Sequence, residues 1–516
     1  MKNLKKLTPF FMAIAFCIII LLTIKDYGIT WDEGVYFLCG ASYFNWLENP
    51  SLETIDKYWS FKFTSNEHPP LVPLLGEMTR SLFHKKLNLM DRVSSFRMAV
   101  LFFVFFLNLA LFSFVSRLYG RKIAFIVSLS FFFLPRIFFH SHLAALDYPV
   151  TAMWFLVIYS YWRGMGQQKW VYCSAILLGL ALLTKLNAYF IYVPVVFFWL
   201  LTFNRKIISL LLGKLKFSLR EILPLFSKIV PMFIIPPLVL TVFWPYMWKN
   251  PLSRILEYPL FSLKLTQVRY TYYFGEVFTH APWHYPFVWS LITIPLIVLI
   301  MFFIGLFKIA QKPYTRTDIF ILFNALLPLI IVALPMVPKY DAERLFLPAF
   351  PFICIISGLG IKQIFDFARK FKAEKLAFIF YMVLFSLTLY NSIIRYHPYQ
   401  SSYFNEIIGG IKGAERRGFE VEYWGNAFIG SLPFLNKHSE STFWVYHHPA
   451  RYRFYDARGL LKKEIKFGDK DNADYLVLLI RQGSFNKEMW RYYECEEPVF
   501  SVRVLNTNLL NIYKLR

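Results

Sequence analysis

The chain has 516 residues, of which 57% are hydrophobic, 20% are aromatic and only 17% are charged. This composition excludes an ordinary soluble protein, and it also holds too many charges for a chain buried wholly in a membrane. The formal net charge of +24 does not indicate nucleic-acid binding, because Lys and Arg fall in short links between apolar runs and not on one basic stripe. We therefore expect a polytopic membrane protein with a polar remainder and no nucleic-acid partner.

Apolar runs recur along residues 1–395, and about eleven of them approach the roughly 20 residues that a helix needs to cross a bilayer. They begin near Thr8, Arg97, Ile123, Tyr148, Val171, Ala188, Ile229, Phe287, Ile319, Leu345 and Leu376. The first run follows the basic stretch Met1-Lys-Asn-Leu-Lys-Lys but lacks a small-residue cleavage site, which favours a retained anchor over a signal peptide. The sequence thus predicts an all-α bundle of about eleven transmembrane helices.

Lys and Arg gather in the links between spans two and three, four and five, six and seven, and ten and eleven. All these links lie on the side of the N-terminus, and cytoplasmic loops carry an excess of Lys and Arg. We therefore expect a multi-pass protein of the cell (inner) membrane with a cytoplasmic N-terminus. An odd number of spans places two long loops, residues 25–96 and 245–286, on the outer side together with the C-terminal tail.

The composition changes sharply at residues 396–516. Short β-branched and aromatic runs are separated there by Gly, Asn, Asp and charged residues, a pattern typical of strands and turns. The expected strands are Phe419–Trp424, Ser441–Tyr446, Tyr475–Ile480 and Phe500–Leu505, with helices over residues 402–417 and 426–437. The tail is therefore predicted to be a small extracytoplasmic α/β domain.

Two adjacent carboxylates follow the first span in Thr30-Trp-Asp-Glu-Gly-Val-Tyr. Charged groups at a membrane boundary are costly unless they are solvated or used. The side chains of Asp32 and Glu33 cannot share one direction, so one can face a substrate while the other holds structure. The alternative is an ordinary solvated acidic pair beyond a helix.

Three further side chains are predicted at the outer edge of the bundle. His68 lies in Glu67-His-Pro-Pro-Leu, where two prolines present it rigidly as a hydrogen-bond donor to an anion. Arg97 opens the second span and Lys185 lies in the short turn between spans five and six, where a lipid-linked phosphate would lie. The alternatives are a Pro-terminated loop for His68, and snorkelling to the headgroups for Arg97 and Lys185.

Asp147 lies at the outer link between spans three and four, in His140-Ser-His-Leu-Ala-Ala-Leu-Asp-Tyr-Pro. Its position before Pro149 favours a helix N-cap, which does not prevent it from acting also as a ligand. A zinc site that combines Asp147 with His140 and His142 is an alternative that we disfavour. No metal ligands are predicted in the site.

The order of these outer-face motifs, over about residues 1–360, resembles GT-C glycosyltransferases of the protein-O-mannosyltransferase and aminoarabinose-transferase type. Lys339-Tyr-Asp-Ala-Glu-Arg, which contains Arg344, looks like a prokaryotic, family 39-like branch. The resemblance implies that Asp32 is the catalytic base, that Arg97 binds phosphate and that Asp147 is a second acidic site. His68 matches the mannosyltransferases, whereas the aminoarabinose transferases carry Lys at that place.

The resemblance further implies an inverting hexosyl- or pentosyltransferase that moves a sugar from a polyprenyl-phosphate donor to a glycan, lipid or protein acceptor on the outer face. We expect Arg97 and Lys185 to hold the carrier phosphate with His68 or Arg344 assisting, and we count Glu33 among the substrate-binding candidates. No cofactor is expected to be obligatory, although a divalent cation stays open. The competing hypotheses are a polytopic transporter or lipid flippase, which would need ionisable residues deep within the spans, and a binding-only scaffold.

A fusion of alkaline phosphatase to the C-terminus tests the predicted topology in a bacterial host. Because the basic links alternate with weakly charged ones, we expect the C-terminus outside and the fused enzyme active. An inactive phosphatase fusion, together with a fluorescent C-terminal fusion that glows in the cytoplasm, would show that the topology is wrong.

Overall fold

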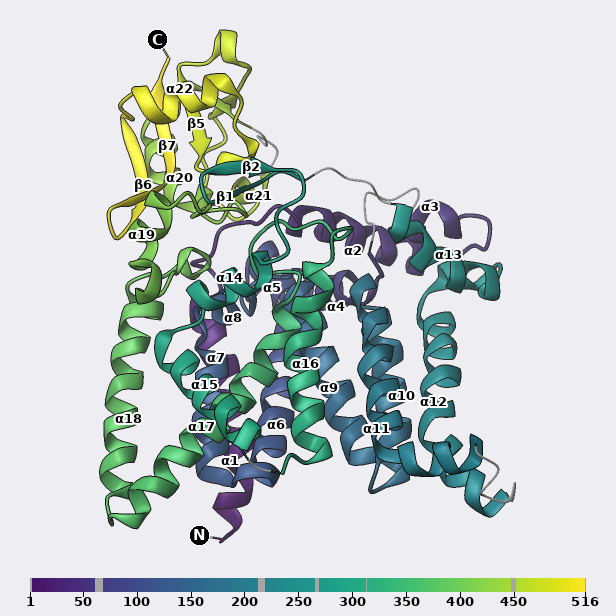
Figure 1. Cartoon of the computed structure of the whole chain (residues 1–516). Helices are drawn as coiled ribbons and strands as arrows, with labels where there is room; N and C mark the ends of the chain where they lie inside the picture. Colours follow the sequence, from purple (N-terminus) through teal and green to yellow (C-terminus); the bar gives the residue numbers. More distant parts are fainter. Residues whose placement is uncertain are drawn as a thin grey trace.

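The computed structural model describes residues 2–60, 68–211, 219–264, 269–311, 313–446 and 452–515. Figure 1 shows a long helical bundle with the N-terminus at its lower end and a small C-terminal sheet region above its upper end. The two termini therefore lie at opposite ends of the bundle, as an odd number of crossings requires. Which end faces the cytoplasm stays a prediction.

A helix lies in each of the eleven predicted stretches. These helices are α1 (Lys2–Thr23), α6 (Val100–Tyr119), α7 (Arg121–Phe132), α9 (Asp147–Gly164), α10 (Gln168–Leu182), α11 (Tyr192–Leu211), α12 (Leu219–Phe243), α14 (Tyr285–Thr293) with α15 (Leu296–Gln311), α16 (Arg316–Ala333), α17 (Phe350–Lys370) and α18 (Glu374–Leu389). Within the described residues, six helices are long and apolar enough to cross a membrane, or up to seven if the bent pair α14–α15 is one span.

The predicted number of eleven spans is thus not confirmed. Helix α7 has only 12 residues, and α10 has 15. The pair α14–α15 bends by 119° where Pro295 interrupts the helix, because proline removes a backbone donor. Apolar runs in the sequence are therefore longer than the straight helices that they form.

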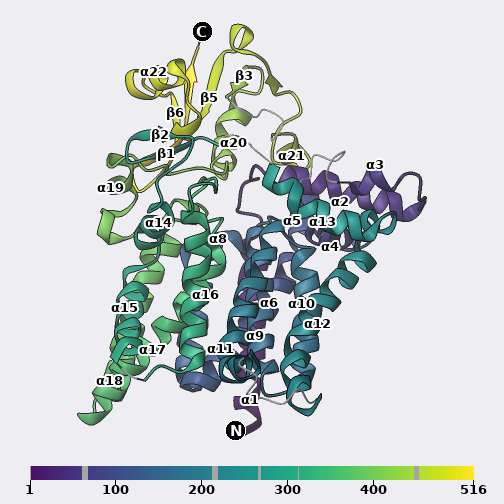
Figure 2. The ribbon, with the colours of Figure 1, turned by 45° about the vertical axis from the view of Figure 1, so that its right-hand side comes forward.

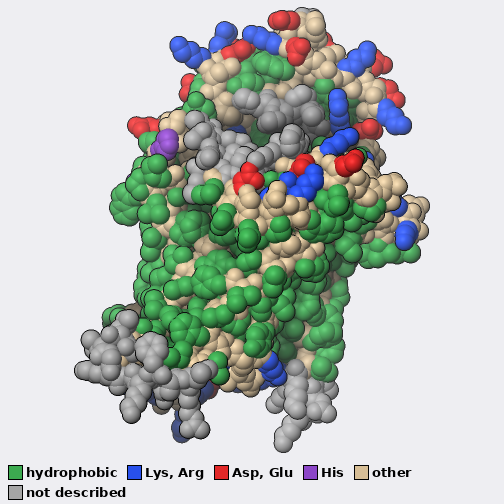
Figure 3. Space-filling model, turned by 90° about the vertical axis from the view of Figure 1, so that its right-hand side faces the viewer, with side chains coloured by type: hydrophobic (Ala, Val, Ile, Leu, Met, Phe, Trp, Pro, Cys, Tyr) green, Lys and Arg blue, Asp and Glu red, His purple; other side chains and the backbone are tan. Residues whose placement is uncertain are grey.

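On the face that Figure 3 shows, hydrophobic side chains cover the middle of the bundle, and most of the visible charged side chains lie at and above its upper end. On α12, the exposed residues Val230, Ile234, Leu238 and Val242 repeat every four positions and so share one face. An apolar surface of this extent suits lipid and not water. The chain is a multi-pass membrane protein.

Helices α15 and α17 cross closely at two glycines. A Cβ atom on Gly305 would lie 2.0 Å from the Ile356 carbonyl oxygen, and one on Gly360 would lie 2.0 Å from that of Met301. Small residues let two backbones approach in this way. The crossing fixes the position of α17 against α15. It therefore also fixes where the loop before α17, which carries Arg344, begins to leave the bundle.

Short elements cover the end of the bundle that faces the C-terminal region (Figures 1 and 2). They include α2 (Glu33–Glu48), α3 (Ile55–Trp59), α4 (Leu71–Arg80), α5 (Arg92–Arg97), α8 (Pro135–His140), α13 (Pro251–Lys264) and the hairpin of β1 (Thr271–Tyr273) and β2 (Glu276–Phe278). The described parts of the two long loops and the tail therefore share one end of the bundle, as predicted.

The C-terminal region contains a five-stranded sheet with the order β4-β3-β5-β7-β6. Its strands are β3 (Thr442–Val445), β4 (Lys466–Phe467), β5 (Tyr475–Leu479), β6 (Phe500–Val504) and β7 (Thr507–Lys514). Strand β3 is parallel to β4 and β5, whereas β7 is antiparallel to β5 and β6. Helices α19 (Gly410–Arg416), α20 (Phe428–Lys437) and α22 (Lys487–Cys495) accompany the sheet.

Three of the four predicted strands are confirmed, but the strand predicted at Phe419–Trp424 is wrong. The carboxylates of Glu420 and Glu422 are buried and accept hydrogen bonds from backbone amides: Glu420 from Gly483, and Glu422 from Trp424 and Gly425. The two bonds of Glu422 lie within a turn of the segment. The segment then packs on the bundle, where the Trp424 carbonyl accepts a hydrogen bond from the Trp31 amide at 3.1 Å.

Candidate active site

Arg344 lies at the centre of a group of charged side chains that we call the Arg344 cluster: Asp32, Asp147, Lys185, Asp341 and Arg344. Its guanidinium donates to Asp32 through Nη2, to Asp341 Oδ2 through Nη1 at 2.5 Å and to Asp147 Oδ2 through Nε at 3.2 Å. Lys185 Nζ donates to the other oxygen of Asp147 at 2.6 Å. The fold therefore brings together Asp32, Asp147, Lys185 and Arg344, which the sequence singled out.

Local backbone geometry leaves these side chains available to one another. Asp32 is the N-cap of α2 but makes no capping hydrogen bond, so its carboxylate is available to Arg344. Lys185 lies in an extended backbone between α10 and the 3-10 helix at Leu186–Ile191. The predicted N-cap role of Asp147 is wrong, because Leu146 takes that position and the Asp147 carboxylate binds Lys185 and Arg344 instead.

Asp32 is the most accessible carboxylate of the Arg344 cluster. Its side chain is 32% exposed, compared with 1% for Asp147 and 6% for Asp341. The Arg344 guanidinium lies 4.1 Å from the centre of the ring of Trp424, a residue of the C-terminal region. This ring covers one face of the guanidinium. A reactant can therefore approach Asp32 more easily than the other two carboxylates.

The charges around Asp32 determine its protonation. Burial alone would raise the pKa of Asp32, but the positive charges nearby, above all Arg344, more than offset this effect and hold the pKa below its usual value. Asp32 is thus ionised at neutral pH. For His68, burial and the charge of Lys185 lower the pKa to about 4, so the ring is neutral at pH 7.

His68 lies within electrostatic reach of Asp32, Asp147, Lys185 and Arg344. Its predecessor in that motif, Glu67, lies outside the described residues. Because the ring is neutral, His68 contributes to the site as a hydrogen-bonding group and not as a fixed positive charge.

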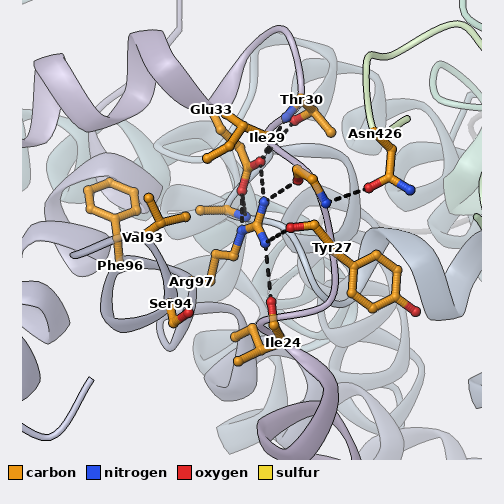
Figure 4. A network of polar contacts seen from close by, with 12 residues as sticks. Ile24, Tyr27, Ile29, Thr30, Glu33, Val93, Ser94, Phe96, Arg97 and Asn426 are labelled. Atoms are coloured by element: carbon orange, nitrogen blue, oxygen red, sulfur yellow. Dashed lines mark hydrogen bonds and ion pairs between the residues drawn. The ribbon is translucent and has the colours of Figure 1, made fainter. Parts of the chain in front are cut away.

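Arg97 is not part of the Arg344 cluster, although the sequence predicted it as a phosphate ligand. Its Nε and Nη2 donate to the two oxygens of Glu33 at 2.7 Å each, Nη1 donates to the Ile24 and Tyr27 carbonyls, and Nη2 also donates to the Gly28 carbonyl. Figure 4 shows these bonds converging on the guanidinium. All five N–H groups are therefore used within the protein, which favours a structural role for Arg97.

Glu33 is fully buried and fixes the loop on which Asp32 lies. Besides Arg97, it accepts hydrogen bonds from the backbone amides of Thr30 at 3.1 Å and Ala144 at 3.0 Å. The adjacent carboxylates thus point apart, as expected: Glu33 into the protein and Asp32 toward Arg344. The same geometry favours a structural role for Glu33 over substrate binding.

The sequence analysis missed a second buried ion pair, between Arg136 and Glu343. Glu343 directly precedes Arg344 in the chain. Glu343 Oε2 lies 3.2 Å from Arg136 Nη1, and its Oε1 accepts a hydrogen bond from Tyr423 at 3.0 Å. A charged residue inside an apolar stretch, such as Arg136 after Leu134 and Pro135, was the available signal.

The imidazoles proposed for the alternative zinc site do not converge. Both ring nitrogens of His142 have protein partners, the Phe138 carbonyl at 2.6 Å and the Thr23 hydroxyl at 2.8 Å, while His140 lies 3.6 Å from Glu343. Within the described part of the chain, no three or more His, Cys, Asp or Glu side chains are grouped to hold a metal ion. The residues therefore do not fit this zinc site, and the metal requirement of the protein stays a separate question.

Replacing Arg97 with Met tests whether the Glu33–Arg97 pair is structural. Removing one partner of a buried ion pair costs about 3–5 kcal/mol, so we expect a much lower melting temperature in detergent. The double variant Glu33→Gln/Arg97→Met is expected to be more stable than Arg97→Met alone, because no charge is left unpaired. Lys470→Ala, which removes an exposed ion pair with Glu488, is the control. If Arg97→Met kept the wild-type melting temperature but bound the donor more weakly, the result would favour the predicted role of Arg97 as a phosphate ligand.

Comparison with known proteins supports the predicted family resemblance. Residues 67–230 match the family described as dolichyl-phosphate-mannose-protein mannosyltransferase. ArnT from Cupriavidus metallidurans, in a crystal structure with bound undecaprenyl phosphate, has a TM-score of 0.50 and 12% identity over 99% of this chain and 98% of ArnT. The oligosaccharyltransferase AglB from Archaeoglobus fulgidus, in complex with an inhibitory peptide and a dolichol-phosphate, has a TM-score of 0.47 and 12% identity over 93% of this chain and 70% of AglB. No curated protein matches the sequence.

The chain thus has an ArnT-like fold over nearly its whole length and a segment that matches the mannosyltransferase family, which confirms the predicted resemblance to GT-C glycosyltransferases.

Proposed function

We propose that this protein is an inverting glycosyltransferase that transfers a sugar from a polyprenyl-phosphate donor to an acceptor on the outer face of the membrane. The observation that carries the proposal is the Arg344 cluster, in which an accessible carboxylate lies beside two cations at one end of an apolar bundle. The match to the mannosyltransferase family and the undecaprenyl phosphate bound to ArnT support this choice of donor. The acceptor is a glycan, a lipid or a protein.

Lys185 and Arg344 are the proposed ligands of the carrier phosphate. Lys185 gives one of its three N–H groups to Asp147, and Arg344 gives three of its five to the carboxylates of the cluster. The remaining donors suit phosphate oxygens, to which charge-assisted hydrogen bonds are strong. They stabilise the negative charge that develops on the phosphate as its bond to the sugar breaks.

Asp32 is the proposed base. The acceptor hydroxyl oxygen attacks the anomeric carbon on the face opposite the phosphate, the carbon–oxygen bond to the phosphate breaks with its electron pair, and the hydroxyl proton passes to Asp32. One displacement inverts the anomeric carbon. The negative charge of the bound phosphate offsets part of the positive charge of Arg344 and Lys185, so the basicity of Asp32 rises when the donor binds.

Protein cations replace a metal ion in this scheme. Because the leaving group is a monophosphate and two cations are present, we propose that no divalent metal is obligatory. Neutral His68 contributes a hydrogen bond to the donor or to the leaving phosphate.

Asp32→Asn tests the proposed reaction. Removing a general base lowers the rate by about 10²–10⁴, while Asn keeps the shape of the side chain and leaves donor binding largely intact. The measurement is the release of polyprenyl phosphate from a panel of polyprenyl-phosphate sugars, with purified protein in nanodiscs, EDTA and no ion gradient. Asp26→Asn, an exposed carboxylate of the same segment, is the matched control.

Turnover without a gradient also separates an enzyme from a transporter or lipid flippase, because only an enzyme forms a new glycosidic bond. Robust turnover by Asp32→Asn would exclude Asp32 as the base. Failure of the wild-type protein to transfer any sugar of the panel to any acceptor, both in EDTA and with added Mg²⁺ or Mn²⁺, would contradict the proposed function itself.

A further inference from the structure

Asp341 lies between two guanidinium groups that come from distant parts of the chain. Its Oδ2 accepts a hydrogen bond from Arg344 Nη1 at 2.5 Å, and its Oδ1 accepts one from Arg481 Nη2 at 2.7 Å. Because Arg344 also binds Asp32, two shared side chains connect Arg481 with Asp32. This connection runs from the end of β5, in the C-terminal sheet, into the Arg344 cluster.

The loop that carries Asp341 has a strained backbone. Asp341 and Ala342 have φ angles of 53° and 55°, in the left-handed region that residues with a Cβ atom disfavour. Such strain persists only where surrounding contacts hold it. Two contacts do so here: the Ala342 amide donates to the Tyr285 hydroxyl at 3.0 Å, and Arg481 binds the Asp341 carboxylate. Arg481 therefore helps to keep Arg344, three residues later, in place.

Arg481 is itself held on a rigid turn. Its amide donates to the Leu479 carbonyl at 2.8 Å, and the next turn packs so closely that a Cβ on Gly483 would lie 2.6 Å from Glu420 Oε1. Its guanidinium lies 5.9 Å from the centre of the ring of Trp31, the residue before Asp32. Support of this kind is what the precise placement of a site residue requires.

Arg481 also balances the charge of Asp341. The charged and titratable groups that face Asp32 are Arg344, Asp147, His68, Lys185, Tyr36 and Tyr340, and those that face Arg481 are Asp341, Glu420, Glu422 and Arg344. If Arg481 were lost, Asp341 would be paired with Arg344 alone. Asp341 would then attract Arg344 more strongly, and Arg344 would move toward Asp341 and away from Asp32.

We propose that Arg481 is a positioning residue of the site, which holds Asp341 so that Arg344 stays in contact with Asp32. This inference rests on the proposed function, because it takes Asp32 as the base. It makes the C-terminal sheet region a part of the active site, since that region supplies a side chain on which the placement of Arg344 depends.

The test uses full-length Arg481→Ala, Arg481→Lys and Asp341→Asn, the double variant Arg481→Ala/Asp341→Asn, and Lys470→Ala as an exposed control in the same region. Because misplacement by about 1 Å costs about 10²-fold in rate, we expect kcat of Arg481→Ala to fall about 10- to 100-fold. Donor KM should rise as well, because Arg344 is also a proposed ligand of the carrier phosphate. Arg481→Lys should recover part of this loss. The double variant should lose no more than the worse single variant, because both residues act through one contact.

The pH profile distinguishes positioning from a general loss of stability. Arg344 lowers the pKa of Asp32, so weakening their contact raises that pKa and moves the acidic limb of kcat/KM to higher pH. The proposal is overturned if Arg481→Ala keeps the wild-type kcat and pH profile, or if the losses in the double variant simply add. If Arg481→Ala does not fold, Arg481→Lys and Asp341→Asn carry the same comparison.

Hydrogen exchange separates this inference from the proposed function, because it needs no turnover. Amides of residues 339–344 should exchange faster in Arg481→Ala than in Lys470→Ala, even if the wild-type protein transfers no sugar. Unchanged exchange in that loop would contradict the inference, whereas loss of transfer in the wild type alone would contradict only the proposed function.

Discussion

Most charged side chains of the candidate site are buried at one end of the helix bundle and form ion pairs, because removing an unpaired ion from water costs several kcal/mol. Three guanidinium groups organise this end: Arg97 with Glu33, Arg136 with Glu343, and Arg344 with three aspartates. Except for Asp341 and Arg344, which are three residues apart, each pair joins segments that are far apart in the chain. The requirement for neutral pairs therefore determines how the loops, the bundle and the C-terminal region meet.

The two carboxylates after the first helix have different surroundings, and the proposed reaction gives a chemical role to Asp32 alone. Glu33 is saturated by Arg97 and backbone amides, so the loop cannot turn without breaking several hydrogen bonds. Asp32, one residue earlier, is held rigidly and yet stays partly exposed beside Arg344. A base that is fixed in position and ionised at neutral pH is what a single displacement needs.

Much of this end of the molecule could be predicted from the sequence. Asp32, Asp147 and Lys185 stood out as ionisable residues at the predicted outer edge of the bundle, and Arg344 lies in a motif of the family resemblance. The structure brings all four together. The surroundings of Arg97 could not be predicted, because three of its five hydrogen bonds go to carbonyls that only the folded loop presents. Arg481 was missed because nothing local links a turn after β5 to residue 341. The number of spans is not confirmed, because apolar length does not reveal where helices bend or stop short.

The most direct test of the account is a structure of the protein with bound polyprenyl phosphate in nanodiscs. It should place the phosphate within hydrogen-bond distance of Lys185 and Arg344, with Asp32 facing the space beside the phosphate and the Glu33–Arg97 pair unchanged. A phosphate bound to Arg97 with that pair broken, or a phosphate bound away from Arg344 altogether, would contradict the assignment of the Arg344 cluster as the active site.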